Sequence, residues 1–245
     1  MLHINTNSPR HAKMSLYVTS VCNLECKECI MMNMMKAASK YQMPIDEVKQ
    51  LIRVSEASNY TFDFVLTGGE PFLYKHILDA LRLLRASRIT KSIVIFSNAM
   101  FYERLNQEVI DLVDSIRVSH YLYNDQHVEK FKSKYPGKVT VVERTEFWPN
   151  PQKPLPPESS NPVECLNPEV LLYDYNVYAC PHSLSIVKKT PHQDLKLCNP
   201  LEVGFMDGLK SIKDNQHDKI CNMCLSNNTV RKNLVKGKNI SLNQI

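Results

Sequence analysis

Short apolar segments alternate with amphipathic helical patterns along the first 145 residues. Five of these segments, rich in β-branched and aromatic side chains, predict strands: residues 15–19, 62–67, 92–97, 116–121 and 138–142. Between them, apolar residues recur every three or four positions and predict helices within residues 45–52, 77–84, 105–112 and 128–135. Repeated strand–helix units imply a parallel sheet with right-handed crossovers, and about six such units would form an open, partial (β/α)6 barrel.

A proline-rich stretch follows this repeating pattern. Seven of the 14 prolines fall between Pro149 and Pro168, and proline both restricts φ and removes a backbone donor. We therefore expect a barrel core over residues 1–148, a stiff connector over 149–164, and a small module with a tail over 165–245. The last part contains a hairpin-like segment, 170–178, and a helical pattern near 206–213. So small a module buries little apolar surface, and a bound metal would supply the missing stability.

The composition is that of a globular protein, with 43% hydrophobic and 22% charged residues. No apolar run reaches the length of a membrane span, and the polar start lacks the apolar region of a signal peptide. We therefore expect a cytoplasmic protein without a membrane partner. The net charge of +5 is modest and the basic run at residues 231–238 lies near the chain end, which argues against nucleic acid as a partner. A mild positive field suits an anionic substrate but does not select one.

Eight cysteines are grouped towards the two ends of the chain, three at the front and five at the back. Because disulfides are rare in a reducing cytosol, grouped cysteines indicate metal binding or redox chemistry. The first group, Cys22, Cys26 and Cys29, lies where the first predicted strand leads into a loop. Three thiolates can bind a cubane iron–sulfur cluster and leave one iron open to a substrate or cofactor. The spacing alone also allows a zinc site completed by His11 or a remote residue.

Adjacent glycines close the second predicted strand, in the sequence Thr67-Gly68-Gly69-Glu70-Pro71. The chain has only six glycines, so two together indicate a backbone that passes close to a ligand or needs a positive φ. The carboxylate of Glu70 can accept hydrogen bonds from an ammonium group. Taken alone, the motif would also suit a simple turn at the end of a strand.

Together the two motifs resemble the radical S-adenosylmethionine superfamily, whose members carry Cys-x3-Cys-x2-Cys after the first strand and Gly-Gly-Glu-Pro after the second. The resemblance implies that Cys22, Cys26 and Cys29 bind a [4Fe–4S] cluster whose open iron holds the amino and carboxylate groups of S-adenosylmethionine. Reductive cleavage then releases a 5′-deoxyadenosyl radical, which abstracts a substrate hydrogen. Contacts to S-adenosylmethionine are implied at three strand ends: Gly68, Gly69, Glu70, Pro71, Ser97, Asn98 and Ser119. One departure is Glu28, because the position before the third cysteine is usually aromatic in this family.

The back of the chain holds a second group of four cysteines: Cys165, Cys180, Cys221 and Cys224. Four thiolates suit structural zinc as readily as a [4Fe–4S] cluster. The arrangement resembles the auxiliary-cluster module, called twitch, of the SPASM/twitch branch of the same superfamily, which implies a second [4Fe–4S] cluster. Residues 173–181 look like the hairpin of that module, with Asn176 in place of the usual turn glycine, because asparagine tolerates the left-handed conformation. Cys198 is left over, either as a free thiol or as a functional one.

Among twitch enzymes, the chain most resembles the 2-deoxy-scyllo-inosamine dehydrogenases, which oxidise a secondary alcohol of an aminocyclitol to a ketone. The resemblance implies an oxidoreductase whose auxiliary cluster takes one electron from the substrate radical. It implies a small sugar-like, aminocyclitol or nucleotide-linked substrate, and an electron donor such as flavodoxin or ferredoxin. A base near the hydroxyl is also required, and we expect it at strand ends facing the barrel mouth: Arg144, Glu143, Glu146, His120 or Tyr121.

Three other functions stay open. Cys198 as a hydrogen donor would make the chain a radical epimerase. A peptide-modifying maturase would usually carry a longer back module and a peptide-docking domain, and the sequence indicates neither. A non-enzymatic zinc-binding module would require the three-cysteine and Gly-Gly-Glu-Pro motifs to occur together by chance.

Overall fold

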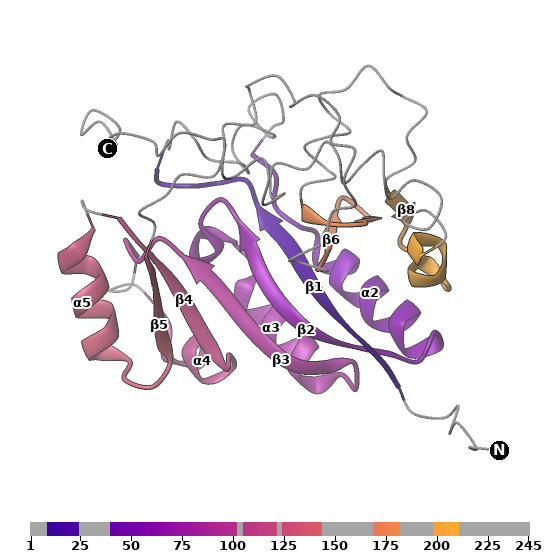
Figure 1. The fold of residues 1–245 in the computed structure, drawn as a ribbon, viewed down its shortest axis with the longest axis horizontal. Helices are drawn as coiled ribbons and strands as arrows, with labels where there is room; N and C mark the ends of the chain where they lie inside the picture. Colours follow the sequence, from indigo (N-terminus) through magenta and orange to yellow (C-terminus); the bar gives the residue numbers. More distant parts are fainter. Residues whose placement is uncertain are drawn as a thin grey trace, which may run out of the picture.

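A single eight-stranded sheet organises the part of the chain that the computed structural model describes, residues 9–24, 40–101, 105–121, 124–143, 169–181 and 198–210 (Figure 1). The strands are β1 (Arg10–Thr19), β2 (Tyr60–Gly68), β3 (Thr90–Ser97), β4 (Ser115–His120), β5 (Val139–Glu143), β6 (Val170–Tyr173), β7 (Asn176–Tyr178) and β8 (Cys198–Pro200). The helices are α2 (Ile45–Ala57), α3 (Ile77–Ala86), α4 (Gln107–Asp111), α5 (Asp125–Lys134) and a short 3-10 turn, η1 (Pro71–Leu73).

The strand order is β5-β4-β3-β2-β1-β6-β7-β8, and every pair from β5 to β6 is parallel. The five strands and four helices expected from the hydrophobic pattern are confirmed, and so is the α/β fold of a partial barrel with a small appended part. The sixth parallel strand was not expected at its position. It is β6, which pairs with the opposite edge of the sheet, Met14 of β1 lying opposite Val170, instead of following β5. The antiparallel strands β7 and β8 then extend that edge.

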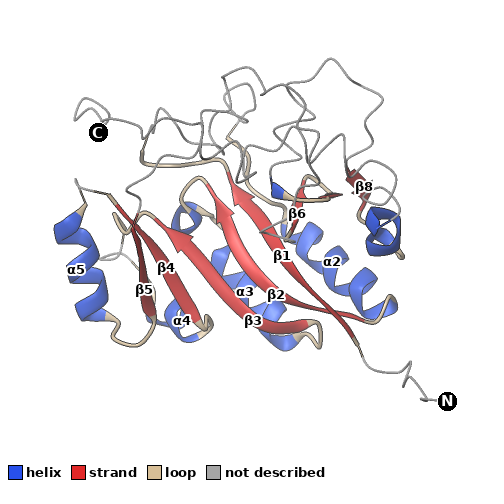
Figure 2. Cartoon of the chain, viewed as in Figure 1, coloured by secondary structure: helices blue, strands red, loops and turns tan. Residues whose placement is uncertain are grey.

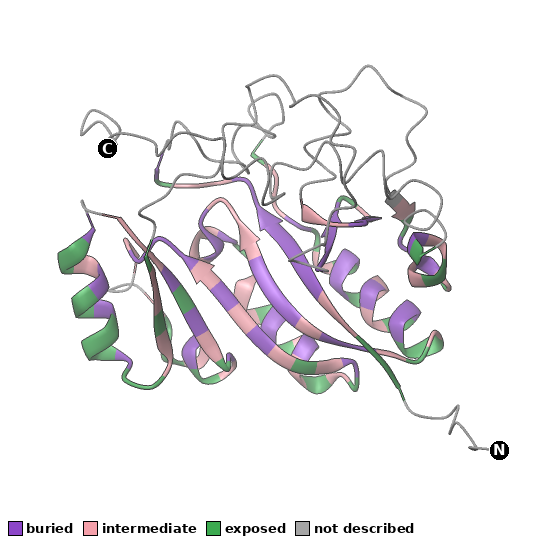
Figure 3. Ribbon diagram, viewed as in Figure 1, coloured by how far each residue is buried: buried purple, intermediate pink, exposed green. Residues whose placement is uncertain are grey.

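One face of the sheet is buried against helices. Alternate side chains of β1 to β4 share a single apolar core with α2, α3 and α5, and α3 and α4 lie behind the strands in Figure 2. The strand residues of this face are Met14, Leu16, Val18, Phe62, Phe64, Leu66, Ile93, Ile95, Ile116 and Val118. Each is at most 1% exposed, so the burial of this face accounts for the alternating purple bands of Figure 3.

The intervening positions of the same strands are mixed: some carry polar or charged side chains, whereas Tyr17 and Val65 are buried. Asp63 on β2 accepts a hydrogen bond from Ser92 on β3 (2.5 Å), and Lys13 on β1 forms an ion pair with Glu169 (3.3 Å). Arg117 on β4 is exposed and lies over the ring of Phe96 on β3, 5.6 Å from its centroid. The face of the sheet opposite the helices therefore combines polar side chains with buried apolar ones.

The carboxyl ends of β1 to β4 lie along one edge of the sheet, as the arrowheads in Figure 1 show. In parallel α/β proteins this edge is where binding and catalytic residues are placed. None of the helices in the described ranges is both long enough and apolar enough to cross a membrane. The connector expected at 149–164 lies outside the described residues.

Candidate cofactor-binding site

The three-cysteine motif starts from an anchored strand end. The hydroxyl of Thr19 accepts a hydrogen bond from the amide of Val21 (3.0 Å) and donates one to the carbonyl of Tyr41 (3.1 Å). Ser20 and Tyr41 also exchange two hydrogen bonds, from Ser20 N to Tyr41 O (3.0 Å) and from Tyr41 N to Ser20 Oγ (2.8 Å). These bonds hold Thr19 and Ser20, which precede the three cysteines, next to Tyr41, which follows them. Among the three, Cys22 is half-buried, and Cys26 and Cys29 lie outside the described residues.

The adjacent glycines let β2 end directly against this strand end. Gly68 has φ +140°, and a Cβ there would lie 2.2 Å from the carbonyl oxygen of Thr19. A Cβ on Gly69 would lie 2.3 Å from the carbonyl oxygen of Val21. The amides of Gly69 and Glu70 donate to those same two carbonyls, at 2.6 and 2.8 Å. Gly68 thus has the positive φ that the glycine pair indicated, and both glycines closely approach the chain's own segment before Cys22.

Glu70 is a completely buried carboxylate. One oxygen accepts a hydrogen bond from the amide of Phe72 (3.2 Å), and the other accepts one from the amide of Asn98 (2.8 Å). Burial raises the pKa of Glu70 to about 7, although the hydrogen bonds from Asn98, Phe72 and Ser97 oppose that rise. Glu70 therefore joins the end of β2 to the end of β3.

Asn98 follows β3 and points towards the cysteine segment. Its amide nitrogen donates to Asn23 Oδ1 (2.9 Å) and lies 3.8 Å from Cys22 Sγ, and its own Oδ1 accepts from the amide of Met100 (3.0 Å). The next residue, Ala99, is fully buried with a φ of 66°, a left-handed conformation that alanine adopts only at an energetic cost. The end of β3 is therefore held in a strained conformation that points Asn98 at Cys22.

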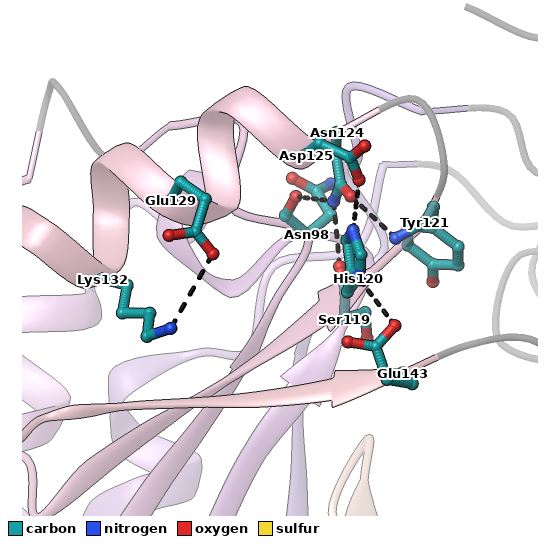
Figure 4. Close-up of polar contacts among 9 residues, drawn as sticks. All are labelled: Asn98, Ser119, His120, Tyr121, Asn124, Asp125, Glu129, Lys132 and Glu143. Atoms are coloured by element: carbon teal, nitrogen blue, oxygen red, sulfur yellow. Dashed lines mark hydrogen bonds and ion pairs between the residues drawn. The ribbon is translucent and has the colours of Figure 1, made fainter.

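Asn124 connects the ends of β3 and β4, and sequence analysis missed it. The completely buried side chain donates to the carbonyls of Asn98 (3.0 Å) and Ser119 (2.9 Å) and accepts from the amide of Tyr121 (2.7 Å), as Figure 4 shows. The one available signal was an asparagine immediately before the helical pattern of α5, which by itself indicates only a helix start. The expected contact residue Ser119 thus belongs to the same network through its carbonyl.

His120 lies beside this network but on the other face of β4. It lies two residues after the buried Val118, and alternate residues of a strand point to the same face, so His120 faces the side covered by α5. Its Nδ1 contacts Glu143 Oε2 (2.6 Å), and its Nε2 makes a short hydrogen bond with Asp125 at the start of α5 (Figure 4). These two hydrogen bonds, Asp125 first and Glu143 second, raise the pKa of His120. Because both ring nitrogens are engaged, His120 links β4, β5 and α5 and has no ring nitrogen left to act as a base.

The remaining sequence candidates divide into described and undescribed residues. Cys180 is half-buried and follows β7, and Cys198 begins β8, opposite Tyr178 in the register. The other candidates lie outside the described residues: Cys165, Cys221, Cys224, Arg144 and Glu146.

One expectation about the hairpin before Cys180 is wrong. Asn176 is not the left-handed turn residue, because it already belongs to β7. The two turn residues with positive φ are Asp174 (50°) and Tyr175 (56°). Two consecutive left-handed residues match the twist of a two-residue hairpin, which a single left-handed residue at the start of β7 would not do.

The described residues fit the negatively charged sulfur of an iron–sulfur cluster ligand. Two N–H groups approach Cys22 Sγ, the amide of Leu24 at 3.4 Å and the side-chain amide of Asn98 at 3.8 Å. N–H donors stabilise a thiolate over a thiol, and the thiolate is the form that binds metal. The strand ends that carry Gly68, Glu70 and Asn98 meet at the same place.

Comparison with known proteins agrees with this site. The family model "4Fe-4S single cluster domain" matches residues 11–137, about half of the chain, and the chain belongs to this family. The matched range includes the three-cysteine motif, all of β2 to β4, and β1 except its first residue. No curated protein matches the chain.

Two solved structures share the fold over nearly the whole chain. One is the crystal structure of BtrN in complex with AdoMet and 2-DOIA, with a TM-score of 0.63 and 14% identity, covering 90% of this chain and 94% of BtrN. The other is SeMet BtrN in an open conformation, with a TM-score of 0.55 and 15% identity, covering 87% and 92%. At these identities the likeness concerns the fold. Together with the family match, it confirms the resemblance to the radical S-adenosylmethionine superfamily.

Proposed function

We propose that the chain is a radical S-adenosylmethionine oxidoreductase that converts a secondary alcohol of a sugar-like or aminocyclitol substrate into a ketone. The observation that carries the proposal is the position of Cys22. Its sulfur lies at the carboxyl edge of a parallel sheet, approached by two N–H groups, where the Gly68–Gly69–Glu70 strand end and Asn98 converge. A site for structural zinc alone would not require this second motif at the cysteine segment.

The residues assigned to the cofactors fall into three sets. The proposed ligands of the first [4Fe–4S] cluster are Cys22, Cys26 and Cys29, and those of the second are Cys165, Cys180, Cys221 and Cys224. The proposed contacts to S-adenosylmethionine are Gly68, Gly69, Glu70, Pro71, Ser97, Asn98 and Ser119. When bound, the first cluster with S-adenosylmethionine supplies the radical that removes a hydrogen atom, and the second cluster accepts the remaining electron.

The chain's own residues prepare the place where this chemistry occurs. Glu70 is dehydrated by burial and keeps acceptor capacity beyond the bonds from Phe72, Asn98 and Ser97, so it can accept a hydrogen bond from the amino group of S-adenosylmethionine. The side chain of Asn98 spends its donors on Asn23 and Cys22, so its further capacity lies in Oδ1, which accepts one hydrogen bond from Met100. Arg144, directly after Glu143 at the end of β5, is the proposed group near the substrate hydroxyl.

The substrate class rests on the comparison of folds. BtrN was crystallised with AdoMet and 2-DOIA, and this chain spans nearly all of BtrN at the level of the fold. A small molecule is therefore favoured over a peptide.

The test is a product analysis with the anaerobically reconstituted protein, S-adenosylmethionine and a reductant, across aminocyclitols, nucleotide sugars and small peptides in deuterated water. We expect one 5′-deoxyadenosine for each ketone, a product that has lost two hydrogen atoms, and full activity in Cys198→Ala. A product of unchanged formula with solvent deuterium at carbon, together with an inactive Cys198→Ala protein, would identify an epimerase instead. Turnover of peptides alone would favour the maturase.

A further inference from the structure

The turn of the β6–β7 hairpin is held by a tyrosine and a buried glutamate from outside the hairpin. The amide of Tyr175 donates to Glu47 Oε1 (3.0 Å), and the amide of Asp174 donates to Tyr41 Oη (3.3 Å). The hydroxyl of Tyr41 in turn donates to Glu47 Oε2 (3.0 Å). We call these four residues, Tyr41, Glu47, Asp174 and Tyr175, the hairpin clamp.

The carboxylate of Glu47 is unusual for its position in the sequence. It lies in the first turn of α2, where acidic side chains are normally solvated, yet it is completely buried. Burying a carboxylate is unfavourable unless hydrogen bonds replace its hydration. Both oxygens of Glu47 receive such bonds, one from Tyr41 and one from the hairpin turn. The burial of Glu47 is therefore linked to the presence of the hairpin.

The turn also needs outside support. Asp174 and Tyr175 are both left-handed, and this conformation is unfavourable for residues with a Cβ, above all for a bulky one such as tyrosine. Two-residue hairpins of this kind usually contain asparagine and glycine at these positions. The clamp binds the amides of the two strained residues, so it stabilises the backbone at the point of strain.

Tyr41 connects the clamp to the three-cysteine segment. Its backbone exchanges hydrogen bonds with Ser20 and accepts one from Thr19, at the point where the chain leaves β1 for Cys22. Its ring packs against those of Tyr17 and Tyr173, with centroids at 6.1 and 4.8 Å. One residue thus touches the segment that begins the first cysteine group and the hairpin that leads to Cys180.

Helix α2 and the residue after it also bind the segment that follows β8. Gln50, one turn after Glu47, makes a short hydrogen bond to the carbonyl of Leu201, and the amide of Leu201 donates to the carbonyl of Tyr175 (2.8 Å). Ser58, at the end of the helix, accepts from the amide of Gly204 (3.1 Å). The residues after Cys198 are therefore fastened to the same helix as the hairpin turn.

We propose that Tyr41 and Glu47 are positioning residues that hold the hairpin leading to Cys180 in register with the segment that carries Cys22. The inference rests on the proposed function in one respect, namely that both segments carry clusters. Electron transfer falls steeply with distance. A loosened hairpin that shifts the second cluster relative to the substrate radical therefore slows oxidation of the substrate and leaves cleavage of S-adenosylmethionine unchanged.

The test is hydrogen exchange of the two turn amides in the full-length reconstituted protein, resolved to single residues by mass spectrometry. We expect Tyr41→Phe to accelerate exchange at Asp174 about tenfold, and Glu47→Ala to do so at Tyr175, because each change removes one acceptor. The control is Tyr74→Phe, which loses a more deeply buried hydroxyl bond, to the carbonyl of Met43 (2.8 Å), without touching the hairpin. Glu47→Gln keeps one acceptor oxygen and should restore most of the protection at Tyr175.

The result that overturns the proposal is unchanged exchange at both amides, or equal acceleration in the Tyr74→Phe control. A second readout is the magnetic coupling between the two reduced clusters in electron paramagnetic resonance, which should weaken in Tyr41→Phe and stay unchanged in Tyr74→Phe. If the parent protein binds about four irons instead of about eight, the second cluster of the proposed function is refuted. The residue-specific exchange pattern would then still establish the clamp by itself.

Discussion

Among single residues, the two glycines after β2 have the most demanding surroundings. Gly68 and Gly69 each leave no room for a Cβ, because carbonyl oxygens of the β1 end lie just over 2 Å from where it would be. Gly68 also has a φ of +140°, which residues with a side chain rarely adopt. The pair thus sets the distance between the end of β2 and the cysteine segment.

Gly68→Ala is expected to lower the free energy of unfolding by about 3 kcal/mol, from the combined backbone strain and steric overlap. Urea denaturation of the apoprotein measures it. The control is Gly137→Ala, where φ is also positive (80°) but nothing lies within 4 Å of the new methyl group, so the cost should be about 1 kcal/mol. Equal costs for the two variants would contradict the close approach of Gly68 to Thr19.

Glu47 makes stability depend on pH. Burial raises its pKa from 4.5 to about 7, so between these values the folded protein binds more protons than the unfolded chain. Its contribution is therefore fully present below about pH 4.5 and is lost as the pH rises through about 7, a change on the order of 3 kcal/mol. Glu70, with a pKa also raised to about 7, acts in the same direction.

The variant Glu47→Gln isolates this effect, since Glu70 remains in both proteins. Unfolding free energies at pH 5 and pH 8 should show the parent losing stability relative to Glu47→Gln as the pH rises. A difference between parent and variant that is the same at both pH values would show that Glu47 ionises normally.

At the scale of elements, the ends of β3 and β4 and the start of α5 are joined by one buried side chain. Asn124 bonds to Asn98, Ser119 and Tyr121, and it does not cap the helix with its side chain, although it precedes α5. The contacts of His120 with Asp125 and Glu143 connect β4 to α5 and to β5 on the other face of the sheet. The carboxyl edge is therefore rigidly connected beside the proposed cofactor site.

Asn124→Ala should cost about 3 kcal/mol of unfolding free energy, because three buried hydrogen bonds of about 1 kcal/mol each are lost. The matched variant is Asn106→Ala at the start of α4, where the exposed side chain makes one capping bond to the amide of Glu108 (2.9 Å), and the expected cost is about 1 kcal/mol. Thermal or chemical denaturation of both variants checks this difference. Similar losses in both would mean that Asn124 acts as an ordinary cap.

At the scale of the whole molecule, the described member of each proposed cluster-binding group, Cys22 and Cys180, follows a strand of the same sheet. β6 lies beside β1, so the strand that leads to Cys22 and the hairpin that leads to Cys180 are neighbours although more than 140 residues separate them. The clamp and the α2 edge fasten this part of the chain to the barrel. The two segments proposed to bind the two clusters are therefore held by neighbouring strands of one sheet.

Changes in the two cysteine groups should separate the two steps of the reaction. Cys26→Ala should abolish formation of 5′-deoxyadenosine, and Cys180→Ala should retain it but yield little ketone. Each variant should lose about four of about eight irons after anaerobic reconstitution. Undiminished 5′-deoxyadenosine from Cys26→Ala, or zinc in place of iron in the second group, would refute the assignment.

The hydrophobic pattern by itself determined strands β1 to β5, the helices between them and their parallel arrangement, because burial of one face imposes a period that a sequence records directly. The two motifs likewise indicated the cofactor class, since thiolate spacing and adjacent glycines are local requirements. The helix expected within residues 105–112 is shorter in the structure, where α4 covers Gln107–Asp111. It begins after Leu105 because the side chain of Asn106 caps its start. Local chemistry therefore predicted most of the fold and the motifs that meet at the proposed site.

Only the tertiary structure decided which distant groups meet. Nothing in the sequence distinguishes Glu47 from the solvated Asp46 beside it, or places Tyr41 between Ser20 and Asp174. The same holds for β6, whose short apolar run suits either sheet edge, and for the turn, where asparagine had seemed the natural left-handed residue. In each case the partner lies far along the chain, and hydrogen bonds between remote segments leave no periodic or local mark on either of them.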